Sequence, residues 1–64
     1  MMTAGAPISM DEAVRMVEKR YRARVVKVET QSDAGHTVYV LRLLDESSGK
    51  VWTVRVDAAS GAVQ

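Results

Sequence analysis

The chain has 64 residues, no cysteine and one histidine, and its nine basic and eight acidic side chains give a formal net charge of +1. This length allows one domain with a small core, and without cysteine it can form neither a disulfide nor a zinc site of the usual tetrahedral kind. The near-balanced charge implies no strong field toward nucleic acid or a membrane. Eleven valines, against three leucines and one isoleucine, favour strands.

The N-terminus is expected to be a flexible segment, residues 1–7, followed by a single domain, residues 8–64. The segment lacks the basic start and apolar stretch of a signal peptide. No apolar run approaches the roughly 18 residues of a membrane span, so we expect no membrane insertion. The residues leave two interpretations open, a cytoplasmic protein or a mature chain whose export signal has been removed.

One helix is predicted from Met10 to about Arg22. Ser9 and Glu12 have the spacing of a capping box, in which each residue satisfies a free backbone N–H group of the other. The apolar residues that follow have helical spacing and predict one core-facing stripe. The stripe consists of Met10, Ala13, Val14, Val17 and Tyr21.

After the helix the apolar period changes from 3.6 to 2, which predicts strands over 24–31, 37–45 and 50–57 and a short fourth piece over 62–64. Alternation places one apolar set on a common face. This set consists of Val26, Val28, Thr30, Tyr39, Leu41, Leu43, Trp52, Val54, Val56 and Val63.

Three glycines punctuate the strands, and each ends a four-residue stretch that we interpret as a hairpin loop with a left-handed glycine. The three loops end at Gly35, Gly49 and Gly61. They predict three flanking pairs, Gln31 with His36, Asp45 with Lys50, and Asp57 with Ala62. Further along, Val28 then pairs with Tyr39, Val26 with Leu41, Leu43 with Trp52, Leu41 with Val54, and Val56 with Val63. All three registers place the same apolar set on one face, and a slip by one residue would break this agreement.

The last two loops share the string Asp-x-x-Ser-Gly, which begins at Asp45 and at Asp57. An aspartate that opens a turn can accept hydrogen bonds from backbone N–H groups two or three residues on. We favour this structural role for Asp45 and Asp57, as for the three glycines. Calcium binding is a weaker alternative, because each loop offers only one or two carboxylates.

The predicted fold class is α+β, with one N-terminal helix packed on a three- to four-stranded antiparallel meander. A single helix covers one sheet face, so the other face is the candidate binding surface. Its apolar residues are either ordinary surface valines or part of a protein-binding patch fringed by arginines. The candidate partner-binding residues are Val38, Val40, Arg42, Leu44, Val51 and Arg55. The same register places Val25, Lys27, Glu29 and Thr53 on this face, and strands one and four are expected to be its edges, either of which could accept a partner strand.

Catalytic chemistry is not expected. His36 has no neighbouring nucleophile motif, and the carboxylate pairs Asp11/Glu12 and Asp45/Glu46 are explained by a helix start and a turn. We expect no catalytic, metal or cofactor site. Nucleic-acid binding is not expected either, because Tyr21, the aromatic residue within the basic cluster, is predicted to lie in the core. The cluster consists of Arg15, Lys19, Arg20, Arg22, Arg24 and Lys27.

Four segments together resemble the PepSY family. Residues 8–13 (ISMDEA) resemble its "lt-x-eqA" opening, residues 25–29 (VVKVE) its first strand, and residues 37–43 (TVYVLRL) its second strand. Residues 49–63 (GKVWTVRVDAASGAV) resemble its closing signature, "G-K-x-Y/W-x-V-x-V-D-A-x-T/S-G-x-V". Asp57 and Gly61 match the most typical positions of that signature.

The resemblance implies a cystatin-like two-layer domain without catalytic residues, of a kind that is mostly extracytoplasmic. Such domains occur in propeptides of thermolysin-like metalloproteases, in a spore-germination regulator, and as small bacterial secreted or periplasmic proteins. We therefore expect a periplasmic or secreted regulatory module without a cofactor. Its partner would be another protein, either a protease, inhibited in the manner proposed for the family, or a sensor. The alternative is a homodimeric structural or ligand-sensing module that uses the exposed sheet face.

Overall fold

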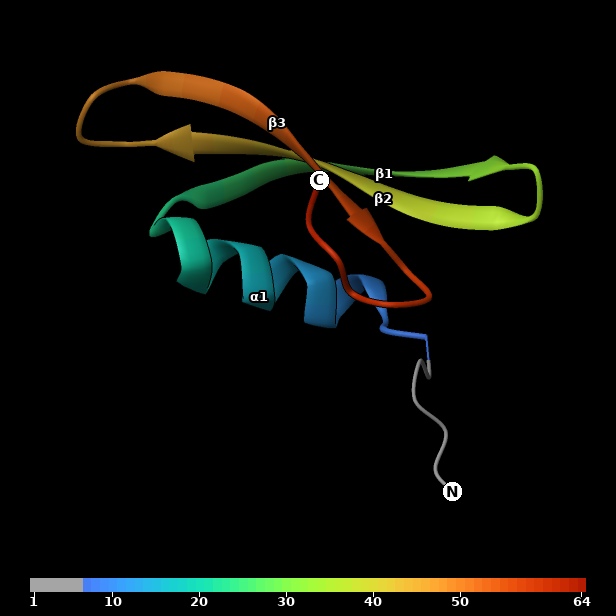
Figure 1. The fold of residues 1–64 in the computed structure, drawn as a ribbon. Coiled ribbons are helices and arrows are strands. Elements are labelled where there is room, and N and C mark those ends of the chain that lie inside the picture. The colour runs from blue at the N-terminus through green and yellow to red at the C-terminus, as the bar shows by residue number, and fades with distance from the viewer. Residues whose placement is uncertain (1–6) are drawn as a thin grey trace.

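The computed structural model describes residues 7–64, so nearly all of the segment expected to be flexible, residues 1–7, lies outside the described residues. One helix, α1 (Met10–Tyr21), precedes three strands, β1 (Arg24–Asp33), β2 (His36–Asp45) and β3 (Lys50–Asp57). The strands form one antiparallel sheet in the order β1-β2-β3, and α1 lies against one of its faces (Figure 1). The predicted α+β architecture is confirmed.

The helix begins where its cap was predicted. Ser9 Oγ accepts a hydrogen bond from Glu12 N at 3.1 Å, and Glu12 Oε1 accepts one from Ser9 N at 3.0 Å, which completes the capping box. The helix ends at Tyr21 because Arg22 adopts a left-handed conformation with φ of 52°. This conformation turns the chain directly into β1.

Packing between α1 and the central strand forms the core. Six buried residues make the central cluster, two from the helix and four from β2 and β3. They are Ala13, Val17, Leu41, Leu43, Val54 and Val56. The predicted helix stripe is only partly buried, because its end residues lie at the rim: Met10 is 39% exposed and Tyr21 is 38% exposed. The expectation that Tyr21 is a core residue is therefore wrong.

The helix is too short to cover the whole sheet face. Its 12 residues span about 18 Å, whereas the ten residues of β1 span about 33 Å. The turn between β1 and β2 accordingly extends beyond α1 (Figure 1). Backbone before the helix covers part of the remainder: Ile8 N donates to Ala58 O at 2.8 Å, and Tyr39 Oη donates to Ile8 O at 2.9 Å.

The register between β2 and β3 is the predicted one. Asp45 pairs with Lys50, Leu43 with Trp52, and Leu41 with Val54. The predicted short fourth strand is reduced to one bridge between Val63 and Val56. It is supported by hydrogen bonds from Asp57 N to Ala62 O and from Gln64 N to Arg55 O. The outer strands of the sheet are thus β1 and β3, which corrects the expectation that the fourth strand is an edge.

The register between β1 and β2 differs from the prediction by two residues. Asp33 pairs with His36, so Val28 lies opposite Leu41 instead of Tyr39. The loop holds only two residues, Ala34 with φ of 50° and Gly35 with φ of 81°. Two successive positive φ values are typical of the type I′ turn that joins strands in two-residue hairpins. The predicted four-residue loop is wrong here.

A β-bulge also corrects the faces at the start of β1. The register shifts between Val25 and Lys27, so Val25 pairs with Leu43 and packs against the core, whereas Val26 is 49% exposed. The alternation had placed Val26 in the core and Val25 on the opposite face. Glu18 Oε2 accepts a hydrogen bond from Val25 N at 2.9 Å, so the helix supplies a partner for backbone at the bulge.

The two other loops share one hydrogen-bond pattern. Gly49 N donates to Asp45 O and Gly61 N to Asp57 O, both at 2.7 Å, and both glycines have positive φ. Each aspartate also accepts through its side chain: Asp45 Oδ1 from Ser47 N at 3.0 Å, and Asp57 Oδ1 from Ala59 N at 2.9 Å. Of these two loops, only the one that begins at Asp45 has a further hydrogen bond from a hydroxyl to the aspartate: Ser47 Oγ donates to Asp45 Oδ1 at 2.7 Å.

Replacing Ala34 with glycine is expected to stabilise the domain by about 0.5–1 kcal/mol, because glycine adopts a positive φ without the steric cost that alanine carries. Ala59→Gly is the matched control, since Ala59 is not among the residues with positive φ. This control should lower the free energy of unfolding by a few tenths of a kcal/mol, because glycine gives the unfolded chain more conformational freedom than alanine does. Urea unfolding of both variants provides the measurement, and a destabilised Ala34→Gly would contradict the two-residue turn.

The Asp45 carboxyl is predicted to titrate in a way that depends on Ser47. The hydroxyl and backbone N–H of Ser47 both donate to the carboxylate and lower the pKa of Asp45 below its ordinary value of 3.8. A lowered pKa means that the stabilising contribution is fully present above pH 3.8 and is lost as the pH falls through the folded value. Ser47→Ala should move the pKa upward in an NMR titration, while Ser60→Ala, in the other loop, should leave it unchanged. An unchanged value in Ser47→Ala would refute the assignment.

Candidate protein-binding face

The sheet face that points away from α1 carries the residues that the sequence singled out. We call this surface the open face, defined by Val38, Val40, Arg42, Leu44, Val51 and Arg55. These residues alternate with the buried ones of β2 and β3, and the cross-strand pairs Val40–Arg55 and Leu44–Val51 place them together. Val38, Val40 and Leu44 are half-buried, Val51 is 51% exposed, and both arginines are exposed.

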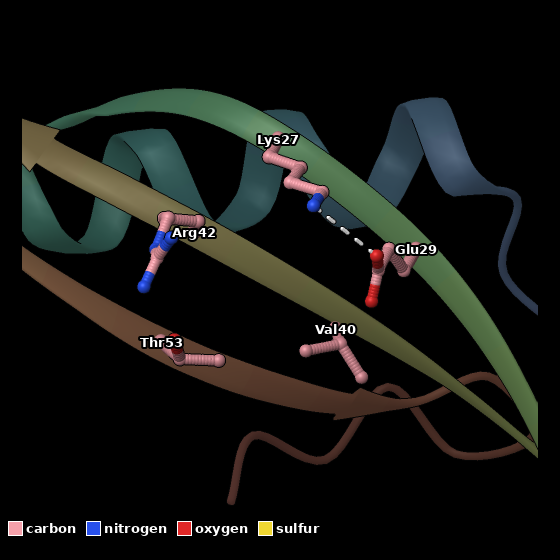
Figure 2. Close-up of a pocket in the computed structure, with 5 residues that line it drawn as sticks. All are labelled: Lys27, Glu29, Val40, Arg42 and Thr53. Carbon is pink, nitrogen blue, oxygen red and sulfur yellow. Dashed lines mark ion pairs between the residues drawn. The ribbon is translucent and has the colours of Figure 1, made fainter.

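A shallow depression of about 230 Å³ lies at the centre of the open face. Figure 2 shows the side chains that line it in front of the sheet, with α1 behind. They come from all three strands and form two cross-strand rows, Lys27–Arg42–Thr53 and Glu29–Val40. Lys27, Glu29 and Thr53 were not among the predicted partner-binding residues, although the register had placed them on this face.

A second, more open depression of about 670 Å³ continues the surface toward the turn between β1 and β2. Val38 and Arg55 are among its lining residues, together with Gln31 and Asp57. Val40 of the first depression pairs directly with Arg55 of the second. The two depressions therefore adjoin along β2. His36, whose chemistry the sequence left unassigned, lines the outer end of the second depression.

The charges on this surface are unevenly compensated. Lys27 Nζ lies 3.4 Å from Glu29 Oε2, as the dashed line in Figure 2 marks, and Arg24 Nη1 lies 3.3 Å from Glu46 Oε2. Among the described residues, Arg42 and Arg55 form no such ion pair. Because the exposed pairs are each worth about 0–1 kcal/mol, they contribute little to stability. The free arginines are therefore the charged groups most available to a partner.

The aromatic residues lie elsewhere. Trp52 pairs with Leu43 on the helix side, and its ring meets that of Tyr21 edge to face, with centroids 6.1 Å apart. Arg20 lies over the Tyr21 ring at 5.9 Å from the centroid. The rim aromatics thus hold the end of α1 to the sheet. Tyr21 therefore lies at the rim of the helix side, partly exposed, and does not belong to the open face.

Groups that could support catalysis or metal binding are sparse among residues 7–64. Within this range no cluster of three or more histidine, cysteine, aspartate or glutamate residues could hold a metal ion. Asp45, whose carboxyl pKa is lowered by its hydrogen bonds with Ser47, opens a turn and is used there. In the same part of the chain no helix has the length and apolar character needed to cross a membrane.

Comparison with known proteins gives one match. Residues 7–64 match the PepSY family model, described as "Peptidase propeptide and YPEB domain". Neither the curated proteins nor the solved structures give a match. The matched range contains the helix, all three strands and the open face, and it confirms the resemblance of the four sequence segments. The chain belongs to the PepSY family.

Proposed function

We propose that this protein is a non-catalytic regulatory module that binds another protein through its open face and modulates it outside the cytoplasm. The observation that carries this proposal is the one-sided packing of the sheet. A single helix buries Leu41 and Leu43 completely, while the alternate residues Val40 and Arg42 face away from it. Half-buried valines next to exposed arginines are the kind of residues that protein interfaces use.

The family supports a protease as the class of partner. The matched model is named for peptidase propeptides, which fits a protease as the protein that the open face would contact. Family members are typically extracytoplasmic, which supports a periplasmic or secreted location. A sensor protein is the other partner class that fits a small module of this kind.

The depressions on the open face fit a protein surface better than a small substrate. The central one, at about 230 Å³, falls below the roughly 300 Å³ at which small-ligand pockets begin. The second one is larger but opens widely at the turn between β1 and β2. A protein partner can cover such shallow surfaces, since interfaces draw on many residues spread over a broad area.

A homodimer that buries the same face is the second candidate, because the half-buried valines would be covered equally well by another copy. Light scattering, which measures the mass of the protein in solution, distinguishes the module that binds another protein from the homodimer. A monomer at high micromolar concentration supports the proposed regulatory module, whereas a dimer that dissociates when the open face is altered supports self-association.

Two identical substitutions on opposite sheet faces test the proposal. Thr53 and Thr30 are both exposed strand threonines, but Thr53 lies on the open face and Thr30 pairs with Tyr39 on the helix side. Thr53→Asp places a carboxylate opposite Arg42 and should weaken partner binding by about tenfold, an effect equal to about 1.4 kcal/mol. Thr30→Asp should change it less than twofold.

The measurement uses thermolysin as the first partner, with calorimetry for binding and peptide hydrolysis for inhibition. A photo-cross-linking residue at position 53 or position 30 provides a second arm in a periplasmic extract. Cross-links to one protein from position 53 alone support the proposal. It is overturned if thermolysin is neither bound nor inhibited and position 53 yields no more product than position 30.

A further inference from the structure

We infer that the open face binds an extended acidic segment of its partner, with Arg42 and Arg55 each pairing with one carboxylate. This inference rests on the proposed function, since it names the chemistry of the protein that the face binds. Its basis is the pair of free guanidinium groups next to the central apolar residue, Val40: Arg42 follows Val40 on the same face of β2, and Arg55 lies opposite it on β3.

The positions of the two arginines are set by the register. Arg42 lies opposite Thr53, and Arg55 lies opposite Val40, so the arginines are diagonal neighbours on adjacent strands. Diagonal pairs have Cβ atoms about 7–8 Å apart. In an extended peptide, residues i and i+2 point to the same side and lie about 6.6–7 Å apart. Alternate acidic residues of one strand are therefore spaced much like the Cβ atoms of the two arginines, and the long arginine side chains can reach them.

Charge compensation selects these two residues from the cations of the face. Glu29 pairs with Lys27 and Glu46 pairs with Arg24, and no described carboxylate lies within ion-pair distance of Arg42 or Arg55. Two like charges at diagonal positions repel each other. An anionic partner removes this repulsion and can form two-pronged hydrogen bonds with each guanidinium group.

The shape of the surface indicates an extended ligand. The central depression and the second depression adjoin at the pair Val40–Arg55 and follow β2 from Arg42 to Val38. These five residues of β2 span about 17 Å, which accommodates a strand of similar length. Val40, which adjoins both arginines, and Val38, which lies two residues further along β2, then offer apolar contacts.

A nucleic acid would bring negative charge as well, but the surface lacks what its bases need. Single-stranded binding relies on aromatic side chains that stack against bases. Among the described residues, the aromatic ones are Tyr21, Tyr39 and Trp52, and their pairing and contacts place them on or beside the helix side of the sheet. Carboxylates of a protein segment fit the open face better than phosphates.

The test is an NMR titration of the isotope-labelled protein with a blocked peptide, acetyl-Glu-Val-Glu-Val-Glu-amide, and with its Gln counterpart. We expect shifts confined to β2, β3 and the adjoining part of β1, and binding about fivefold tighter for the Glu peptide. Raising the salt concentration should remove most of this difference, because the pairs are exposed.

Two double variants are compared, and each removes two positive charges: one from the open face and the other from the helix on the opposite side of the sheet. Arg42→Gln with Arg55→Gln should abolish the preference for the Glu peptide. Arg15→Gln with Lys19→Gln, both exposed on α1, should retain it. A single-stranded oligonucleotide serves as a further probe, and tighter binding of it than of the Glu peptide would overturn the inference.

The outcomes separate this inference from the proposed function. Equal affinity for the Glu and Gln peptides, or an unchanged preference in the double arginine variant, overturns the acidic-segment inference. In that case cross-linking from position 53 would still support protein binding at the open face. If position 53 also gave no specific product, the proposed function would fail separately.

Discussion

The contact between α1 and the central strand is the interaction on which the rest of the structure depends. Ala13 and Val17 of the helix and Leu41 and Leu43 of β2 have no exposed surface, and the remaining core residues pack around them. A chain of 64 residues has material for one such layer contact. The helix therefore covers one sheet face, and the alternation that buries Leu41 and Leu43 necessarily turns Val40 and Arg42 away. Core formation and the open face have the same origin.

Much of the fold followed from local signals, but two features of β1 did not. The start of the helix could be predicted because the cap at Ser9 is encoded within four residues. Alternation fixes which face a residue occupies, yet a shift by two residues leaves every face unchanged, so it could not distinguish the two-residue turn at Ala34 from a four-residue loop. The sheet faces of the adjacent residues Val25 and Val26 could not be assigned from the sequence for a different reason. The bulge that orients them coincides with a hydrogen bond from Val25 N to Glu18, a contact between helix and strand that sequence spacing does not reveal.

The candidate site was predictable to the extent that it depends on residue alternation. All six proposed residues lie on the sheet face that points away from α1, because alternation along β2 and β3 fixes the face of each residue. The depression that joins Lys27, Glu29 and Thr53 to them was not foreseen, since its shape depends on how the three strands twist together. Nor could the sequence show which cations are free. That distinction arises from Lys27 and Arg24 each having a carboxylate neighbour, whereas Arg42 and Arg55 have none among the described residues.

The central claim, that packing of one helix leaves the opposite sheet face accessible, is tested most directly by the solvent accessibility of individual methyl groups. A soluble gadolinium chelate broadens methyl signals in proportion to their exposure. We expect strong broadening at Val40 and Val51 and little at Leu41 and Leu43, with the same pattern at low and high protein concentration. Equal protection of Val40 and Leu41 at low micromolar concentration would contradict the account, because the open face would then be covered in the free protein.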